Sequence, residues 1–179
     1  MYESSWFTIV LAILPANLIY WNCVNRIVKL LVFVMACELV GIASTPFTLA
    51  GIPTWYQALN KPLFSPPNWI FGPVWTILYF LMGVSAFLVW EKGLRARGVK
   101  IALYYFLAQL ILNFVWSLLF FGLHSPILAF LDIVGLWILI VLTIIKFFAI
   151  SRVASYLLLP YILWVSFAAV LNFVIVILN

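Results

Sequence analysis

Polar side chains recur at helical spacing inside long apolar stretches of this sequence. Gln109, Asn113 and Ser117 follow one another at intervals of four, so on a helix all three lie on one face, with Trp116 beside them. Asp132 lies about two turns into the next apolar stretch. In hydrocarbon such side chains are costly and usually face the interior of a helix bundle. They are therefore candidates for a binding site or for hydrogen bonds between helices.

Aromatic side chains follow the same spacing in two other apolar stretches. Trp75 and Tyr79 share one helical face with small residues that follow them, and Tyr161, Trp164 and Asn172 share another face near the C-terminus. Aromatic stacking contributes about 0.5 to 1.5 kcal/mol beyond the burial of area, so several such rings around one cavity could hold a flat macrocycle. Helix packing alone produces the same spacing, so the pattern is consistent with a ligand cavity and with helix packing.

Residue patterns of common catalytic and metal sites are missing from the sequence. It contains no glycine-rich phosphate loop, no HExxH motif and no nucleophile elbow. Cys23 and Cys37 lie in or beside apolar segments, which predicts neither a disulfide framework nor a zinc site. His124 is a candidate haem ligand, although a lone histidine in a tight loop is more often a solvated or capping group. We predict no metal site and no required cofactor.

The elements that position these residues must be membrane helices. Of the 179 residues, 68% are hydrophobic and 7% are charged, whereas a soluble domain has roughly 25% charged residues. Six apolar blocks can be distinguished: Trp6 to Trp21, Leu30 to Ala50, Trp69 to Trp90, Ile101 to Gly122, Pro126 to Phe148 and Val153 to Leu178. Five have the length of a span. We predict an all-α integral membrane protein with one domain over residues 30–179.

The first block is the ambiguous one. It has about 16 residues and contains Pro15, so it is either a tilted sixth span or a segment that lies in the membrane interface. The residues before it include Glu3 and no Lys or Arg, which does not fit a cleaved signal peptide. We therefore treat residues 1–29 as an N-terminal apolar extension of the mature protein.

Basic residues distinguish the two faces of the membrane. If all six blocks span, eight of the nine Lys and Arg residues lie on one face and Lys61 lies on the other. The positive-inside rule assigns the first face to the cytoplasm, with both chain ends outside; if the first block does not span, the N-terminus moves inside. This asymmetry is typical of a bacterial cytoplasmic membrane and is compatible with an organelle membrane. The basic residues form no dense patch of the kind that binds nucleic acid.

The segment from Gly51 to Asn68 is long for a loop and carries four prolines and three aromatic residues. Because proline fixes φ and lacks a donor, no helix is expected to run through it, and Ser65 before Pro66 suits a helix N-terminus. Its aromatic residues either form an interfacial belt or cover a cavity as a lid. The lid candidates are Trp55, Pro62, Pro66 and Pro67.

Four strings of the sequence resemble the TspO family, also called tryptophan-rich sensory protein, translocator protein or peripheral-type benzodiazepine receptor. They are WYQALNKPLFSPPNWIFGPVWTILYFLMG from Trp55, QLILNFVWSLLFFG from Gln109, AFLDIVGLW from Ala129 and LLLPYILWVSFAAVLNFVIVILN from Leu157. Within them WYxxLxKPxxxPP and NxxWS combine rare residues at fixed spacing. The resemblance covers about Leu30 to Asn179 and leaves the first apolar block without a counterpart.

This resemblance implies a five-helix bundle, often dimeric, with a cavity for tetrapyrroles such as protoporphyrin IX or haem, for sterols and for benzodiazepine-site ligands. Carried over by motif position, the cavity residues are Tyr56, Trp75, Asn113, Trp116, Ser117, Asp132, Trp164, Ala168 and Asn172. Two alternative functions are also open, the first implied by the resemblance and the second a separate class. One is light- and oxygen-dependent porphyrin degradation through Trp75 and Trp164, and the other is a stress-sensing scaffold that acts through partners. The last block lacks the Tyr and Arg of the animal cholesterol motif.

Overall fold

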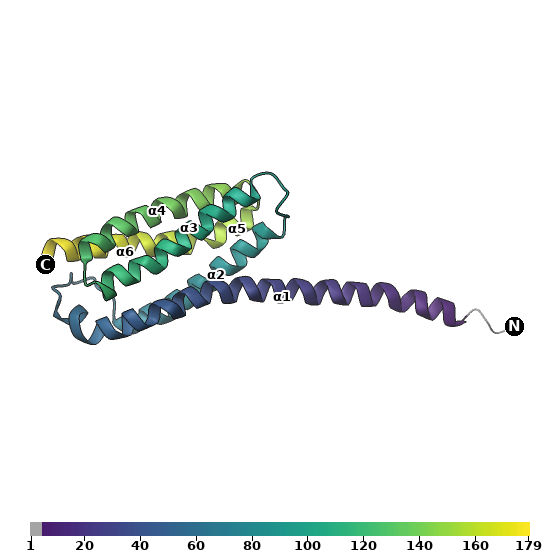
Figure 1. Ribbon diagram of the computed structural model, residues 1–179, viewed down its shortest axis with the longest axis horizontal. Coiled ribbons are helices and arrows are strands. Elements are labelled where there is room, and N and C mark those ends of the chain that lie inside the picture. Colours follow the sequence, from purple (N-terminus) through teal and green to yellow (C-terminus); the bar gives the residue numbers. More distant parts are fainter. Residues whose placement is uncertain (1–4) are drawn as a thin grey trace.

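The computed structural model describes the backbone of residues 5–179 and the side chains from Val24 onward. The elements, among them two π-helical turns (η1, η3) and one 3-10 turn (η2), are α1 (Ser5–Gly51), η1 (Ile52–Tyr56), η2 (Asn68–Ile70), α2 (Phe71–Trp90), α3 (Val99–Ser117), η3 (Leu118–Gly122), α4 (Pro126–Phe148), α5 (Arg152–Leu157) and α6 (Leu159–Leu178). Within residues 24–179, five helical segments are long and apolar enough to cross a membrane. The prediction of a five-helix membrane bundle is therefore confirmed (Figure 1).

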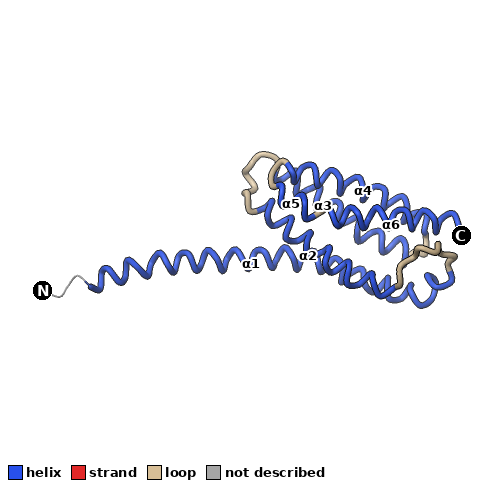
Figure 2. Tube along the Cα trace, turned by 180° about the vertical axis from the view of Figure 1, so that it is seen from behind, coloured by secondary structure: helices blue, strands red, loops and turns tan. Residues whose placement is uncertain are grey.

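The first helix joins the first two apolar blocks of the sequence, Trp6 to Trp21 and Leu30 to Ala50. It is continuous over 47 residues, about 70 Å at 1.5 Å per residue, whereas the hydrocarbon core of a bilayer is about 30 Å thick. Figure 2 shows its N-terminal part extending past the other helices. The helix continues through Arg26 and Lys29, which separate the two blocks, because residues 22–29 contain neither glycine nor proline to end it. The two alternatives for residues 6–21, a sixth span or an interfacial segment, concern side chains outside the described residues.

Prolines account for the other differences from the expected boundaries. Pro53 lies in η1, a π-helical turn that follows α1 without a break, so the chain stays helical as far as Tyr56 and the loop is shorter than expected. The last apolar block is divided at Leu158, because Pro160 cannot donate to the preceding turn. α4 has the predicted bounds and is capped by the preceding residue Ser125, whose hydroxyl oxygen accepts a hydrogen bond from Leu128 N at 3.4 Å.

The two ends of the bundle differ in charge. Residues 57–67 and the C-terminus lie at one end, and the loop of residues 91–98 lies at the other (Figure 1). The first end is closed by reciprocal hydrogen bonds, because Asn60 N donates to Asn179 Oδ1 at 2.9 Å and Asn179 Nδ2 donates to Asn60 O at 3.1 Å. Lys61 belongs to this end, whereas Arg26 pairs with Glu91 at the other end. The C-terminus therefore lies opposite the basic end, as the charge pattern predicts.

Candidate functional site: a tryptophan-lined cavity

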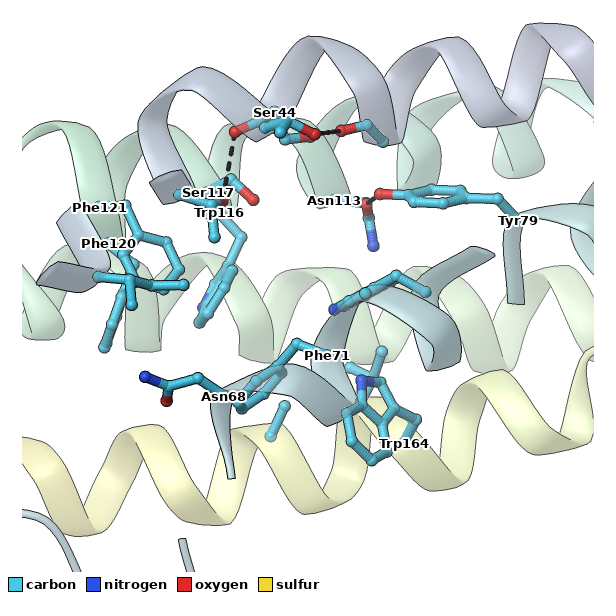
Figure 3. A pocket seen from close by; sticks show the side chains of 18 of the residues that line it. Ser44, Asn68, Phe71, Tyr79, Asn113, Trp116, Ser117, Phe120, Phe121 and Trp164 are labelled. Atoms are coloured by element: carbon cyan, nitrogen blue, oxygen red, sulfur yellow. Dashed lines mark hydrogen bonds between the residues drawn. The ribbon is translucent and has the colours of Figure 1, made fainter. Parts of the chain in front are cut away.

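A cavity of about 450 Å³ lies between α1, α2, α3 and α6, in the half of the bundle that carries residues 57–67. Its wall is mostly apolar and aromatic, with a small number of polar groups. Small-molecule sites typically have this composition and a volume of roughly 300 to 1,000 Å³. Figure 3 shows Trp116, Phe71 and Trp164 around the cavity, with Ser44 on the α1 side.

The cavity brings together eight of the nine residues that the family motifs suggested. They are Tyr56, Trp75, Asn113, Trp116, Ser117, Trp164, Ala168 and Asn172. These residues belong to η1, α2, α3 and α6 and are far apart along the chain. Within α3 and α6 they recur at intervals of three or four, and this spacing directs one face of each helix at the cavity.

Asp132 is the ninth residue, and it is not among the residues that line the cavity. From the same helix α4, the cavity is lined by Ile133 and Leu136 instead. Neighbouring residues on a helix differ by about 100° in direction, so the face that buries Ile133, Leu136 and Ile140 leaves Asp132 beside the cavity wall. Its Oδ2 atom is buried and has no hydrogen-bond partner among the described residues.

The four lid candidates also lie outside the lining. Trp55 stacks on His124, with ring centres 4.8 Å apart, and meets the edge of Phe120. Pro62, Pro66 and Pro67 belong to the segment that links η1 to η2. This part of the chain reaches the cavity through Tyr56, Asn68 and Trp69, of which the last two were not predicted.

Lys61 fixes the position of Tyr56 at the end of the cavity. Its Nζ atom donates a hydrogen bond to the Tyr56 carbonyl oxygen at 3.0 Å and lies 4.5 Å from the centre of the Tyr56 ring. This cation–π contact and the hydrogen bond hold a nearly buried ring against Phe120 and Phe121 of η3. The loop therefore supports one wall of the cavity even though its prolines do not line it.

A hydrogen-bond network connects three helices at the inner end of the cavity. The Tyr79 hydroxyl donates to Asn113 Oδ1 (Figure 3), and Asn113 Nδ2 donates to the Tyr161 hydroxyl oxygen at 3.1 Å. Tyr161 in turn donates to Gln109 Oε1 at 2.8 Å. Gln109 is 1% exposed and does not line the cavity. The polar series of α3 is thus divided, because Gln109 joins helices, Ser117 lines the cavity, and Asn113 does both.

Asn172 is held in a similar way near the other end of the cavity. Its Oδ1 atom accepts a hydrogen bond from Trp116 Nε1 at 3.1 Å, and its Nδ2 atom donates to Pro126 O at 2.9 Å. The carbonyl oxygen and the amide nitrogen of Asn172, like those of Asn113, therefore each make a hydrogen bond within the protein. In contrast, the buried Nε1 atom of Trp164 has no hydrogen-bond partner in the described part of the chain. Among the buried side-chain atoms of the residues that line the cavity, Trp164 Nε1 is the one donor without a partner in the described part of the chain.

The α1 wall of the cavity was not predicted, although its signal is present in the sequence. Glu38, Gly41, Thr45 and Thr48 line the cavity and follow one another at intervals of three or four. The Thr45 and Thr48 hydroxyls donate to carbonyls one turn earlier in the helix, at 3.0 and 3.3 Å. Within the described residues there is no group of three His, Cys, Asp or Glu side chains that could hold a metal ion.

Comparison with known proteins gives consistent matches over most of the chain. A family model described as the TspO/MBR family matches residues 33–178. The tryptophan-rich protein TspO of Archaeoglobus fulgidus is 46% identical over 155 residues, which cover 86% of this chain and 99% of that protein. The tryptophan-rich sensory protein of Cereibacter sphaeroides is 36% identical over 143 residues, 80% of this chain and 86% of that protein. The translocator protein of Homo sapiens is 36% identical over 121 residues, 66% of this chain and 71% of that protein.

Proposed function

This chain belongs to the TspO/MBR family, and from that premise we propose that its cavity binds a tetrapyrrole such as protoporphyrin IX. The observation that carries the proposal is the position of Trp75 on α2, Trp116 on α3 and Trp164 on α6 around one cavity. Three indole rings from three helices offer flat apolar surfaces to a planar ligand. The five-span bundle makes the chain a multi-pass membrane protein, so such a ligand would be held at membrane depth.

Aromatic neighbours hold two of these rings in place before any ligand binds. Trp75 stacks on Tyr79 with centres 5.4 Å apart and planes 30° apart. Trp116 stacks on Phe120 with centres 5.0 Å apart and planes 13° apart. Side chains that are already ordered lose less conformational entropy on binding, which favours a rigid ligand of matching shape.

The polar groups of the cavity indicate which tetrapyrrole fits. The unpaired Trp164 N–H can donate to a carboxylate or another acceptor of the ligand. The described lining contains no His, Cys or Met, three common axial ligands of haem iron, and His124 is engaged with Trp55 outside it. Recognition therefore depends on the faces of the macrocycle, and metal-free protoporphyrin IX is the ligand that we propose first.

The test is a titration of the purified protein with protoporphyrin IX, followed by quenching of tryptophan fluorescence and by the porphyrin absorption band. We expect saturable binding that weakens in the double variant Trp75→Ala and Trp164→Ala. Two lost stacking partners at about 0.5 to 1.5 kcal/mol each correspond to roughly 5- to 150-fold in Kd. Trp137→Ala is the control, because Trp137 lies on α4 outside the lining and donates to Ser166 Oγ at 2.8 Å.

The proposal fails if the wild type shows no saturable binding, or if the double variant binds as tightly as the control. The same samples separate a binding protein from a porphyrin-degrading enzyme when they are illuminated in air. A binding protein returns the porphyrin spectrum unchanged after extraction, whereas an enzyme yields a new chromophore over repeated turnovers. If Trp75 and Trp164 take part in that turnover, replacing these two residues would abolish it.

A further inference from the structure

A second hollow, of about 700 Å³, lies at the basic end of the bundle between α1 and the end of α2. We call it the basic groove. Three cations line it, Arg26 and Lys29 from α1 and Arg95 from the loop after α2. Glu91 is the one carboxylate among its described lining residues, and Phe87 and Trp90 form its aromatic wall. None of these residues belongs to the tryptophan-lined cavity.

The charges of the groove do not cancel. Glu91 is occupied by Arg26, whose Nε and Nη2 atoms lie 2.5 and 3.0 Å from Oε1 and Oε2 in a two-pronged ion pair. Lys29 and Arg95 then leave the lining with two positive charges in excess. The Nζ atom of Lys29 lies 5.5 Å from the centre of the Trp90 ring, which holds this cation over the aromatic wall.

The groove lies where a membrane has its headgroups. Trp90 is the last residue of the spanning helix α2, and tryptophan is typical of the interface. One turn nearer the bundle than Lys29 and on the same side of α1, Val32 is 61% exposed. An apolar surface therefore begins where the cationic surface ends. A ligand that matches both surfaces has a phosphate at one end and hydrocarbon at the other.

We propose that the basic groove binds the phosphate headgroup of an anionic phospholipid, with Lys29 and Arg95 as the cations that contact it. The Arg26–Glu91 pair would fix α1 against the end of α2 and so keep the groove open. The acyl chains would lie along the exposed face of α1. Basic pockets between membrane helices bind anionic lipid headgroups in this manner. The site is independent of the tetrapyrrole proposal, because the two share no residue.

The test measures phospholipid binding to the full chain in detergent by native mass spectrometry, with palmitoyl-oleoyl phosphatidylglycerol and the matching phosphatidylcholine. We expect the wild type to retain the anionic lipid preferentially. The double variant Lys29→Gln and Arg95→Gln should lower that affinity about 30-fold, which is about 2 kcal/mol at 1.4 kcal/mol per tenfold change. The charge-conserving variant Lys29→Arg and Arg95→Lys should restore most of the affinity.

The matched control is the double variant Lys146→Gln and Arg152→Gln. It removes the same charge from residues of α4 and α5 that lie outside the groove. An equal loss in both double variants would show a general charge effect and overturn the proposal, as would equal retention of the two lipids by the wild type. Inorganic phosphate is titrated separately. If phosphate alone saturates the groove and displaces the lipid, the ligand is a soluble anion and the lipid assignment is wrong.

Discussion

At Gly83 the backbone of α1 lies directly against α2, and this contact predicts a cost for an added methyl group. A Cβ atom at Gly83 would lie 2.5 Å from Val34 Cα, 2.9 Å from Val34 N and 3.0 Å from Phe33 O. Carbon atoms in contact are normally about 3.5 to 4.0 Å apart. All three neighbours are backbone atoms, so no side chain can rotate away. Gly83→Ala therefore requires the two helices to separate by about 1 Å.

We expect Gly83→Ala to lower the free energy of unfolding by about 1 to 3 kcal/mol, the usual cost of overpacking. Gly72→Ala is the matched control on the same helix, because a Cβ there has nothing within 4 Å. Replacing a helical glycine by alanine in open space gains about 0.5 to 1 kcal/mol. The two variants should therefore differ by about 1.5 to 4 kcal/mol.

The assay is SDS-titrated unfolding in mixed micelles, followed by circular dichroism. A Gly83→Ala protein as stable as the wild type would contradict the helix spacing, and so would a Gly72→Ala protein that loses as much stability as Gly83→Ala. Since α1 and α2 both line the cavity, the Gly83→Ala protein should also bind protoporphyrin IX less tightly. The porphyrin titration measures that effect in the same preparation.

Three further predictions concern polar and small residues. Asn113→Leu removes the acceptor of the Tyr79 hydroxyl and a donor to Tyr161, so SDS titration should show a loss of about 1 to 3 kcal/mol; an unchanged midpoint would refute the network. Gly41→Ala places a Cβ 2.5 Å from the Tyr79 ring, so the ring should shift and porphyrin affinity should fall, and an unaltered Kd would contradict this. The Arg26–Glu91 pair is exposed, at 62% and 34%, so a double-mutant cycle with Arg26→Gln and Glu91→Gln should give a coupling below about 1 kcal/mol that declines with salt. A larger, salt-independent coupling would show that the pair is buried in the membrane protein.

The spans could be predicted from the sequence because hydrocarbon imposes a length and an apolar composition on each of them. α4 has the predicted bounds, and α2 ends at Trp90 as predicted. The start of α1 could not be predicted in this way, because charged residues indicate where a chain leaves the membrane but do not end a helix. Arg26 and Lys29 lie within a helix that continues on both sides of them. A helix end needs a residue such as glycine or proline, or a competing cap.

The cavity residues could be predicted where several of them share a helical face, and not where one residue was considered alone. Trp75 and Trp164 were found because small and aromatic residues recur around them at helical spacing. Asp132 was assigned to the cavity as a single carboxylate. It is the neighbour of Ile133, which lines the cavity, and so points in a different direction from the helix axis. Sequence spacing gives the relative direction of two residues on one helix. It does not give the direction of the helix face relative to its neighbours.

Hydrogen bonds inside the bundle decide what the cavity can recognise. Asn113 and Asn172 would be expected to contact polar ligand edges, but each uses both its carbonyl oxygen and its amide group within the protein. Each therefore has one N–H and one lone pair of its carbonyl oxygen left for a ligand, in a direction that the existing hydrogen bonds fix. Trp164 also has its N–H left to donate. Selectivity in this cavity should therefore follow ligand shape together with the position of an acceptor near Trp164.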